Sequence, residues 1–220
     1  MIDAPIPTDS ILLQWTTAPL AEATAHALAR VAYSHALCAA LHRAAGLAAR
    51  ITISRFAWSP ATGRTYVYAD LASRASVTQQ SLDCVRAAAQ SLLAPGCDIT
   101  ASRLERVFDQ PGAAFGQQRV AHYVVEMDPA DGWMPEIFRW YDEEHMPGLA
   151  AVQGNIHSRR YLNHDGGPLS LACYDLVAPE VLACPAWLKV RASAWSDITR
   201  PHFTNTLRTM FSTIDKVDCP

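Results

Sequence analysis

Residues 154–176 decide the fold. They read Gly154-Asn155-Ile156-His157-Ser158-Arg159-Arg160-Tyr161-Leu162, then a polar turn, then Leu169-Ser170-Leu171-Ala172-Cys173-Tyr174-Asp175-Leu176. An earlier stretch has the same organisation: Gly46-Leu47-Ala48-Ala49-Arg50-Ile51-Thr52-Ile53-Ser54-Arg55-Phe56, a polar turn, then Thr65-Tyr66-Val67-Tyr68-Ala69-Asp70-Leu71. Each stretch predicts a hairpin whose first strand follows a glycine and whose second strand ends in Asp-Leu. The chain is therefore predicted to be built twice.

Each predicted hairpin has the same surroundings. In the first half, a strand at 11–15 and a long helix at about 20–44 precede the hairpin, and a helix at 80–93 and a strand at 99–108 follow it. In the second half the corresponding elements are predicted at 120–127, 133–145, about 179–192 with a break at Pro185, and 203–214. Residues 109–116 read as the linker between the halves.

The order β-α-β-β-α-β is the split βαβ arrangement. Two helices on one face of a four-stranded sheet leave the other face apolar and in need of a partner. We therefore predict an α+β fold of two tandem ferredoxin-like modules, residues 1–110 and 118–216, packed sheet to sheet as an intrachain pseudo-dimeric α+β barrel. A barrel of this kind encloses space for a small ligand.

The composition limits the classes of function. Of 220 residues, 50% are apolar and only 18% are charged, which indicates a large core, and the formal net charge of -3 argues against nucleic acid as a partner. Apolar runs fall short of the ~20 residues that cross a bilayer, and the N-terminus lacks a signal-peptide pattern. The six cysteines form neither a Cys-x-x-Cys pair nor a zinc-spaced Cys/His cluster. We expect a cytoplasmic protein with reduced thiols, no metal, no membrane contact and no nucleic-acid partner.

The most unusual segment is 133–149, which contains Trp140-Tyr141-Asp142-Glu143-Glu144-His145-Met146-Pro147. Tyr141 and His145 are four residues apart and share one helical face. Pro147 is predicted to end the helix, which places His145 in the last turn, where the helix dipole favours a protonated imidazole and Asp142 is one turn away. An imidazole beside a carboxylate and a phenol suits proton transfer to or from an organic molecule. The alternative is a histidine that caps a surface helix.

These residues resemble a known group of proteins. The segment 140–149, Gly154 and Arg159-Arg160-Tyr161, together with Ala186-Trp187, Trp195 and Arg200-Pro201-His202-Phe203, are similar to the EthD-like branch of the dimeric α+β barrel superfamily. The resemblance implies small enzymes without cofactors, such as cyclases, lactone isomerases, dehydratases, decarboxylases and quinone-forming monooxygenases. It also implies a cavity near the motif histidine, here His145, with Tyr141 beside it. The first half lacks the motif, because its position matching His145 is Leu37.

Further candidates are predicted to bind the substrate. His157, Arg159 and Tyr161 share one face of their strand, where Arg159 is suited to bind a carboxylate or to stabilise an enolate or phenolate oxygen. The alternative for this face is an exposed edge strand. Either His122 or Tyr123 faces inward on its strand, and alternation alone does not decide which. The remaining candidates for pocket walls, for which core packing is the alternative, are Trp140, Trp187, Trp195 and His202.

The leading hypothesis is a cofactor-independent lyase, isomerase or cyclase acting on a small, mostly apolar, aromatic or polyketide-like substrate. His145 would be the general acid/base, with Tyr141 and Asp142 as its catalytic partners. Nucleotide-binding glycine motifs and a Gly-x-Ser-x-Gly elbow are absent. One alternative is haem binding with a buried histidine as axial ligand, since haem-dependent members of the superfamily also join two modules in one chain. Another is a non-catalytic ligand-binding module, and the fused chain is also a candidate homodimer.

Overall fold

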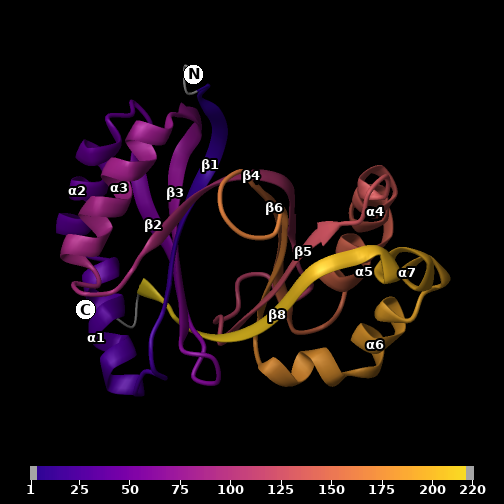
Figure 1. Cartoon of the computed structure of the whole chain (residues 1–220). Coiled ribbons are helices and arrows are strands. Elements are labelled where there is room, and N and C mark those ends of the chain that lie inside the picture. The colour runs from indigo at the N-terminus through magenta and orange to yellow at the C-terminus, as the bar shows by residue number, and fades with distance from the viewer. Residues whose placement is uncertain (1–3, 217–220) are drawn as a thin grey trace. The chain divides into compact units, whose positions relative to one another are not determined.

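The computed structural model describes residues 4–216, which form two compact units (Figure 1). Unit 1 contains residues 4–105, 163–167 and 212–216, and unit 2 contains residues 106–162 and 168–211. Each unit has its own hydrophobic core between its sheet and its helices. No helix in the described part of the chain is long and apolar enough to cross a membrane.

Unit 1 places three helices on one side of an antiparallel sheet (Figure 1). Its elements are β1 (Ile6–Thr16), α1 (Glu22–Ala32), α2 (His35–Ala45), β2 (Ile51–Trp58), β3 (Arg64–Val77), α3 (Gln79–Leu92) and the start of β4 (Thr100–Pro111). The strand order is β4-β1-β3-β2, and the end of β8 pairs with β2. The helices pack on the sheet through small residues such as Ala25, Ala29 and Ala32, which recur at helical spacing.

Two predictions for unit 1 are wrong in detail. The long helix predicted at 20–44 is two helices, because Ser34 adopts an extended conformation and its hydroxyl caps α2 by accepting a hydrogen bond from the Leu37 amide at 3.1 Å. Gly46 does not begin a strand. It ends α2 with a left-handed backbone (φ 63°), as glycine commonly does at this position, and β2 begins only at Ile51.

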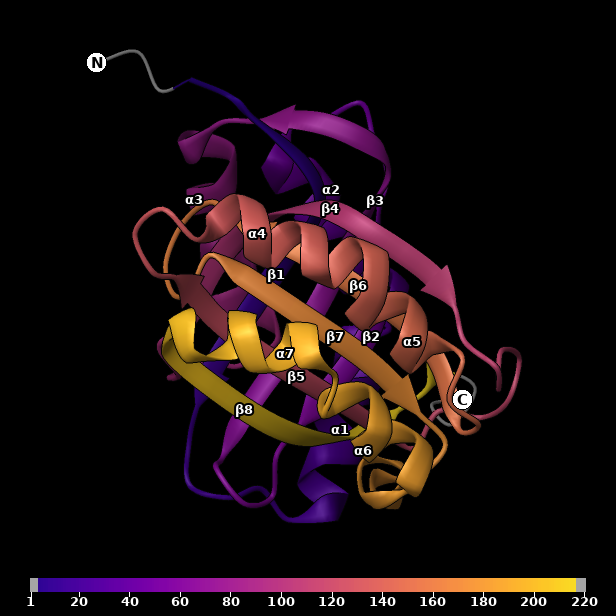
Figure 2. The same cartoon turned by 90° about the vertical axis from the view of Figure 1, so that its right-hand side faces the viewer.

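Unit 2 covers one face of its sheet with short helices (Figure 2). Its elements are β5 (Ala121–Pro129), α4 (Met134–Trp140), the π-helical turn η1 (Tyr141–His145), α5 (Met146–Ala150), β6 (Asn155–Asn163), β7 (Ser170–Leu176), the 3-10 turn η2 (Pro179–Ala183), α6 (Pro185–Arg191), α7 (Ala194–Thr199), the 3-10 turn η3 (Arg200–His202) and β8 (Phe203–Ile214). The strand order is β8-β5-β7-β6, and β6 is followed by the end of β4. The last strand begins and ends where the sequence predicts.

The eight antiparallel strands have a closed hydrogen-bonded order. It runs β1-β3-β2-β8-β5-β7-β6-β4, and β4 pairs again with β1. This is the strand order of an eight-stranded antiparallel barrel, as the sequence predicts. Strand β4 extends to Pro111, so residues 109–111, predicted to belong to a linker, are part of a strand.

The helix that carries the motif does not end before Pro147. It continues through a π-helical turn into α5 and stops at Ala150. In this turn the Met146 amide donates to the Tyr141 carbonyl five residues earlier. The wider turn lets the helix pass Pro147, which has no amide hydrogen and lies in the first turn of α5. His145 therefore lies inside a continuous helical segment, and the prediction that it occupies a last turn is wrong.

Candidate functional site

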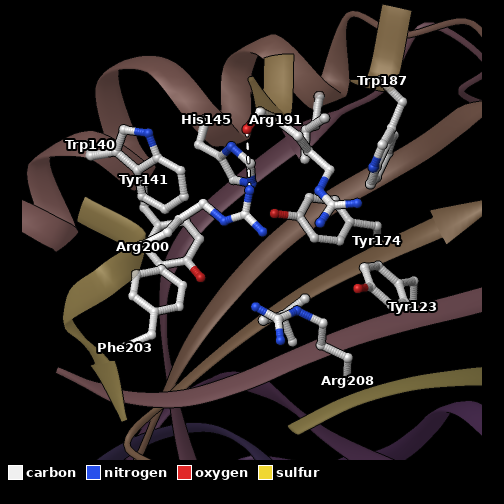
Figure 3. Close-up of a pocket in the computed structure, with 12 residues that line it drawn as sticks. Tyr123, Trp140, Tyr141, His145, Tyr174, Trp187, Arg191, Arg200, Phe203 and Arg208 are labelled. Carbon is white, nitrogen blue, oxygen red and sulfur yellow. Dashed lines mark hydrogen bonds between the residues drawn. The ribbon is translucent and has the colours of Figure 1, made fainter. Parts of the chain in front are cut away.

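A small pocket in unit 2 lies against the π-helical turn (Figure 3). Its free volume is about 30 Å³, enough for a water-sized group. Its lining is aromatic, aliphatic and basic and contains no acidic residue. The twelve lining residues are Tyr123, Val125, Trp140, Tyr141, His145, Leu149, Tyr174, Trp187, Arg191, Arg200, Phe203 and Arg208. We call it the His145 pocket.

His145 is held between aromatic rings. Its side chain is buried, its ring stacks on Trp140 with centroids 4.1 Å apart, and Tyr141 meets it edge-on at 5.7 Å. Among residues 4–216, the buried imidazole Nδ1 has no hydrogen-bond partner. Stacking fixes the ring, and an unpartnered nitrogen is unusual for a buried polar group.

The charge state of His145 differs from the one predicted. Burial, followed by the positive charges of Arg200 and Arg191, lowers the pKa of His145 to about 3. The imidazole is therefore neutral near pH 7. The expectation of a protonated imidazole is therefore wrong, because the ring is buried and lies near two positively charged arginines. A neutral imidazole is able to accept a proton.

Three arginines from three different elements extend to the pocket. Arg191 ends α6, Arg200 begins η3, and Arg208 lies on β8 (Figure 3). Arg200 is anchored by a hydrogen bond from its Nη1 to the Arg191 carbonyl oxygen at 3.2 Å. Burial and the neighbouring charges of Arg191 and Arg208 lower the pKa of Arg200. Like charges thus repel each other at this end of the pocket.

Three tyrosines supply hydroxyl groups. Burial raises the pKa of Tyr123, Tyr141 and Tyr174, so all three stay protonated and are able to donate hydrogen bonds. In Figure 3 the Tyr123 and Tyr141 hydroxyls are directed toward the arginine side chains. The Tyr174 hydroxyl lies 3.0 Å from the Met146 sulfur. Phenol donors beside guanidinium groups are suited to stabilise negative charge on a ligand oxygen.

Asp142, predicted to assist His145, lies outside the pocket lining. Its carboxylate accepts a hydrogen bond from Arg160 Nη2 at 2.9 Å. The Arg160 guanidinium is buried and lies over the rings of Phe138 and Tyr141. Asp142 therefore does not contact the pocket itself. It pairs with Arg160, which packs against the ring of Tyr141, a residue of the pocket lining.

The predicted face of β6 belongs to a different polar network. Arg159 contacts Asp109 at 3.4 Å and Asp175 at 3.5 Å, and His157 contacts Asp109. His122 is fully buried, with Nδ1 2.8 Å from Asp175 Oδ1. His122 therefore faces this network and Tyr123, its neighbour in sequence, faces the pocket, which decides the alternative that the sequence left open. Tyr161 is buried outside the pocket lining.

The predicted aromatic walls divide into two groups. Trp140 and Trp187 line the pocket. Trp195 and His202 do not: the Trp195 indole donates to Glu136 at 2.8 Å, and His202 stacks on Trp133 with centroids 3.4 Å apart.

Sequence reasoning missed the pocket's basic side. Arg191, Arg200 and Arg208 are distributed over a helix, a turn and a strand. No periodicity relates them, and only the fold brings them together. Arg200 lies in the Arg-Pro-His-Phe stretch that carries part of the resemblance, and this was the one available signal.

The pocket does not fit a haem group. A porphyrin would need a flat space many times larger than the roughly 30 Å³ that is free here, and Trp140 stacks directly on the imidazole. Within residues 4–216, no three His, Cys, Asp or Glu side chains are placed to hold a metal ion.

Comparisons with known proteins identify the fold. No protein-family model matches the chain, and no curated protein matches its sequence. An anthrone oxidase-like protein superposes with a TM-score of 0.58 at 11% identity, over 94% of this chain and 92% of the other. A protein from Lactobacillus acidophilus, provisionally described as a monooxygenase, gives 0.58 at 9% identity over 95% and 94%. A protein provisionally described as a chlorite dismutase gives 0.54 at 12% identity over 96% and 98%.

At such low identity the likeness establishes the fold and leaves the activity open. The likeness supports the α+β barrel fold that the sequence predicts, while membership of the superfamily and of its EthD-like branch stays a prediction.

Proposed function

We propose that the chain is an enzyme that transfers a proton on a small, mostly apolar organic substrate, with neutral His145 as the general base. The observation that carries this proposal is the buried imidazole of His145, which lines a pocket together with phenols and guanidinium groups and whose Nδ1 has no hydrogen-bond partner among the described residues. A base and groups that stabilise negative charge are the two components that proton abstraction next to a carbonyl requires.

The reaction proceeds in two proton transfers. His145 takes a proton from the carbon next to the substrate carbonyl, and the electron pair of that bond moves onto the carbonyl oxygen. Arg200 and the hydroxyl of Tyr141 stabilise the resulting enolate oxygen. The imidazolium then returns its proton, either to another carbon, which completes an isomerisation, or to a leaving group, which completes an elimination. Neither route needs an oxidant or a bound cofactor, so we propose a cofactor-independent lyase or isomerase. A cyclase would use the same enolate: its carbon would form a bond to a second carbonyl carbon of the substrate, and the oxygen of that carbonyl would take the proton from the imidazolium.

The low pKa of His145 is compatible with its role as a base, because negative charge develops on the substrate during the reaction. Arg200 and Arg191 oppose protonation of the imidazole. An enolate oxygen bound by the same arginines offsets their charge and makes the imidazolium easier to form. The base is thereby strengthened as the proton is transferred, which is when strengthening lowers the barrier.

We also infer that the chain is a fusion of two ferredoxin-like modules and that the second is the EthD-like one. The orders β4-β1-β3-β2 and β8-β5-β7-β6 repeat one pattern, which supports the two-module interpretation. The His145 pocket is lined by residues of unit 2 alone. The chemistry is accordingly assigned to the C-terminal half.

The proposal is tested by hydrogen exchange at carbon. The purified protein is incubated in deuterated water with a panel of aromatic and polyketide-like carbonyl compounds, and deuterium uptake and product formation are followed by mass spectrometry. We expect His145→Gln to slow turnover by about 10²–10⁴-fold, the usual contribution of a general base. His202→Gln is the matched control, because His202 stacks on Trp133 outside the pocket lining. Equal rates for the His145 variant and the unmodified protein, or exchange with no compound of the panel, would contradict the proposal.

A further inference from the structure

The His145 pocket concentrates positive charge in an acidic protein. The chain carries 21 acidic against 18 basic residues, yet no acidic side chain lines the pocket. Elsewhere arginines meet carboxylates: Arg74 lies 2.8 Å from Asp9, and Arg103 lies 2.6 Å from Asp165. Within the described residues, by contrast, none of the three pocket arginines has a carboxylate within 4.0 Å.

This arrangement costs free energy in the empty protein. Arg200 is partly buried, and its guanidinium donates a hydrogen bond to the Arg191 carbonyl oxygen, which holds it near Arg191. Arg191 and Arg208 approach the same space from α6 and from β8 (Figure 3). Charges of one sign held together at a partly desolvated site are stabilised by a bound counter-ion, and planar guanidinium groups match the two oxygens of a carboxylate.

The rest of the lining is aromatic. Trp140, Phe203 and Trp187 are among the residues that line the pocket, and Phe203 meets Trp140 edge-on at 5.9 Å. Rings of this kind pack against a flat aromatic ligand. An inorganic anion would leave these surfaces unused. Arg208 is exposed, so its side chain is free to move and admit a ligand larger than the present free volume.

We propose that this pocket binds a small aromatic carboxylate, with the carboxylate held by Arg191, Arg200 and Arg208 and the ring packed against Trp140, Phe203 and Trp187. This inference names the substrate class of the enzyme proposed above and rests on that function for its catalytic meaning. The substrate then carries both a carboxylate and the carbon from which His145 removes a proton. Its charge also offsets the arginines that oppose protonation of His145, so the base is strengthened only when the pocket is filled.

Binding is tested by isothermal titration calorimetry with benzoate, its neutral isostere benzamide and inorganic phosphate. We expect benzoate to bind, and benzamide and phosphate to bind at least tenfold more weakly. Equal binding of benzamide would show that the carboxylate is not recognised, and equal binding of phosphate would show that the aromatic ring is not. Either result, or the absence of benzoate binding, overturns the inference.

Variants connect the binding to the arginines. Arg200→Gln and, independently, Arg208→Gln are expected to weaken benzoate binding at least tenfold. The second variant guards against misfolding, because Arg208 is exposed. Arg139→Gln is the matched control, since Arg139 pairs with Glu136 on α4 outside the pocket lining. Unchanged affinity in both folded pocket variants overturns the assignment.

The two proposals fail in different ways. His145→Gln is expected to keep its affinity for benzoate, because the arginines hold the carboxylate. Benzoate binding with no turnover of any carboxylate-bearing carbonyl compound would refute the catalytic role and leave the binding site intact. Turnover of neutral compounds without benzoate binding would refute the substrate class and leave the role of His145 intact.

Discussion

The guanidinium group of Arg200 lies beside the imidazole of His145 and is, after burial, the largest cause of the low pKa of that histidine (Figure 3). The proposed base and one of the three arginines proposed to bind the anion therefore interact electrostatically. Removing the charge of Arg200 should change the pKa of His145, and this change can be measured without knowledge of the substrate.

Replacing Arg200 with glutamine is expected to raise the pKa of His145. Removal of a neighbouring positive charge makes protonation easier, but burial, which is the larger cause, remains, so the pKa should stay below its ordinary value of 6.5. An NMR titration of the histidine side chains measures the shift. Arg139→Gln should leave the His145 resonance unchanged. A His145 pKa that is the same in the Arg200 variant would show that the two groups are not coupled.

The stability of the protein should depend on His145 in acid. The imidazole has a pKa of about 3 in the folded chain and about 6.5 when unfolded, so the unfolded state binds more protons between these values. The free energy of unfolding therefore falls as pH drops from 6.5 toward 3, with a contribution that approaches about 1.4 kcal/mol per pH unit. Urea unfolding of the unmodified protein and of His145→Gln at pH 7 and pH 4.5 measures it. The variant should lose less stability between the two pH values, because other titrating groups are common to both proteins. Equal losses would contradict the burial of a neutral imidazole.

The sequence predicts features that lie within one continuous segment. His145, Tyr141 and Trp140 belong to a single helical stretch, so their spacing was enough to bring them together. Strand β8 is predicted at 203–214, which are the bounds that the structure gives it. The closed strand order follows from the repeated hairpins.

What the sequence does not reveal depends on geometry between segments or on departures from regular periodicity. A periodicity of 3.6 residues per turn does not predict a π-helical turn. The sequence therefore predicts that the helix ends at Pro147, whereas the helix passes this residue. The alternation of side chains along β6 predicts that His157 and Arg159 share one face of the strand, but it does not predict whether that face lines the pocket. The network around Asp175 occupies that face.

Asp142 provides a test of a structural role against a catalytic one. Replacing it with alanine removes the carboxylate that pairs with Arg160, whose guanidinium is buried and leaves its Nε and Nη1 without hydrogen bonds. We expect the free energy of unfolding to fall by roughly 1–3 kcal/mol, because a buried charged donor loses its acceptor. The pKa of His145 should not move, since Asp142 is not among the groups that shift it. Urea unfolding and the histidine titration measure the two effects. A marked shift of the His145 pKa with little change in stability would restore the orienting role that the sequence predicts for Asp142.

Gly154, which begins the second predicted hairpin, should tolerate no side chain. Its φ of 95° is outside the range that L residues commonly adopt, and a Cβ atom there would lie 2.6 Å from Val181 Cγ2. Gly154→Ala combines backbone strain with a clash against a buried side chain, and we expect a loss of roughly 2–4 kcal/mol in the free energy of unfolding. Gly166→Ala is the matched control, because nothing lies within 4 Å of a Cβ atom at that position. Thermal and urea unfolding should show a large decrease for the first variant and a change within about 0.5 kcal/mol for the second. If the two variants were equally stable, the close approach of Val181 to the start of β6 would be wrong, and so would the placement of the β6–β7 hairpin that carries Tyr174 into the His145 pocket.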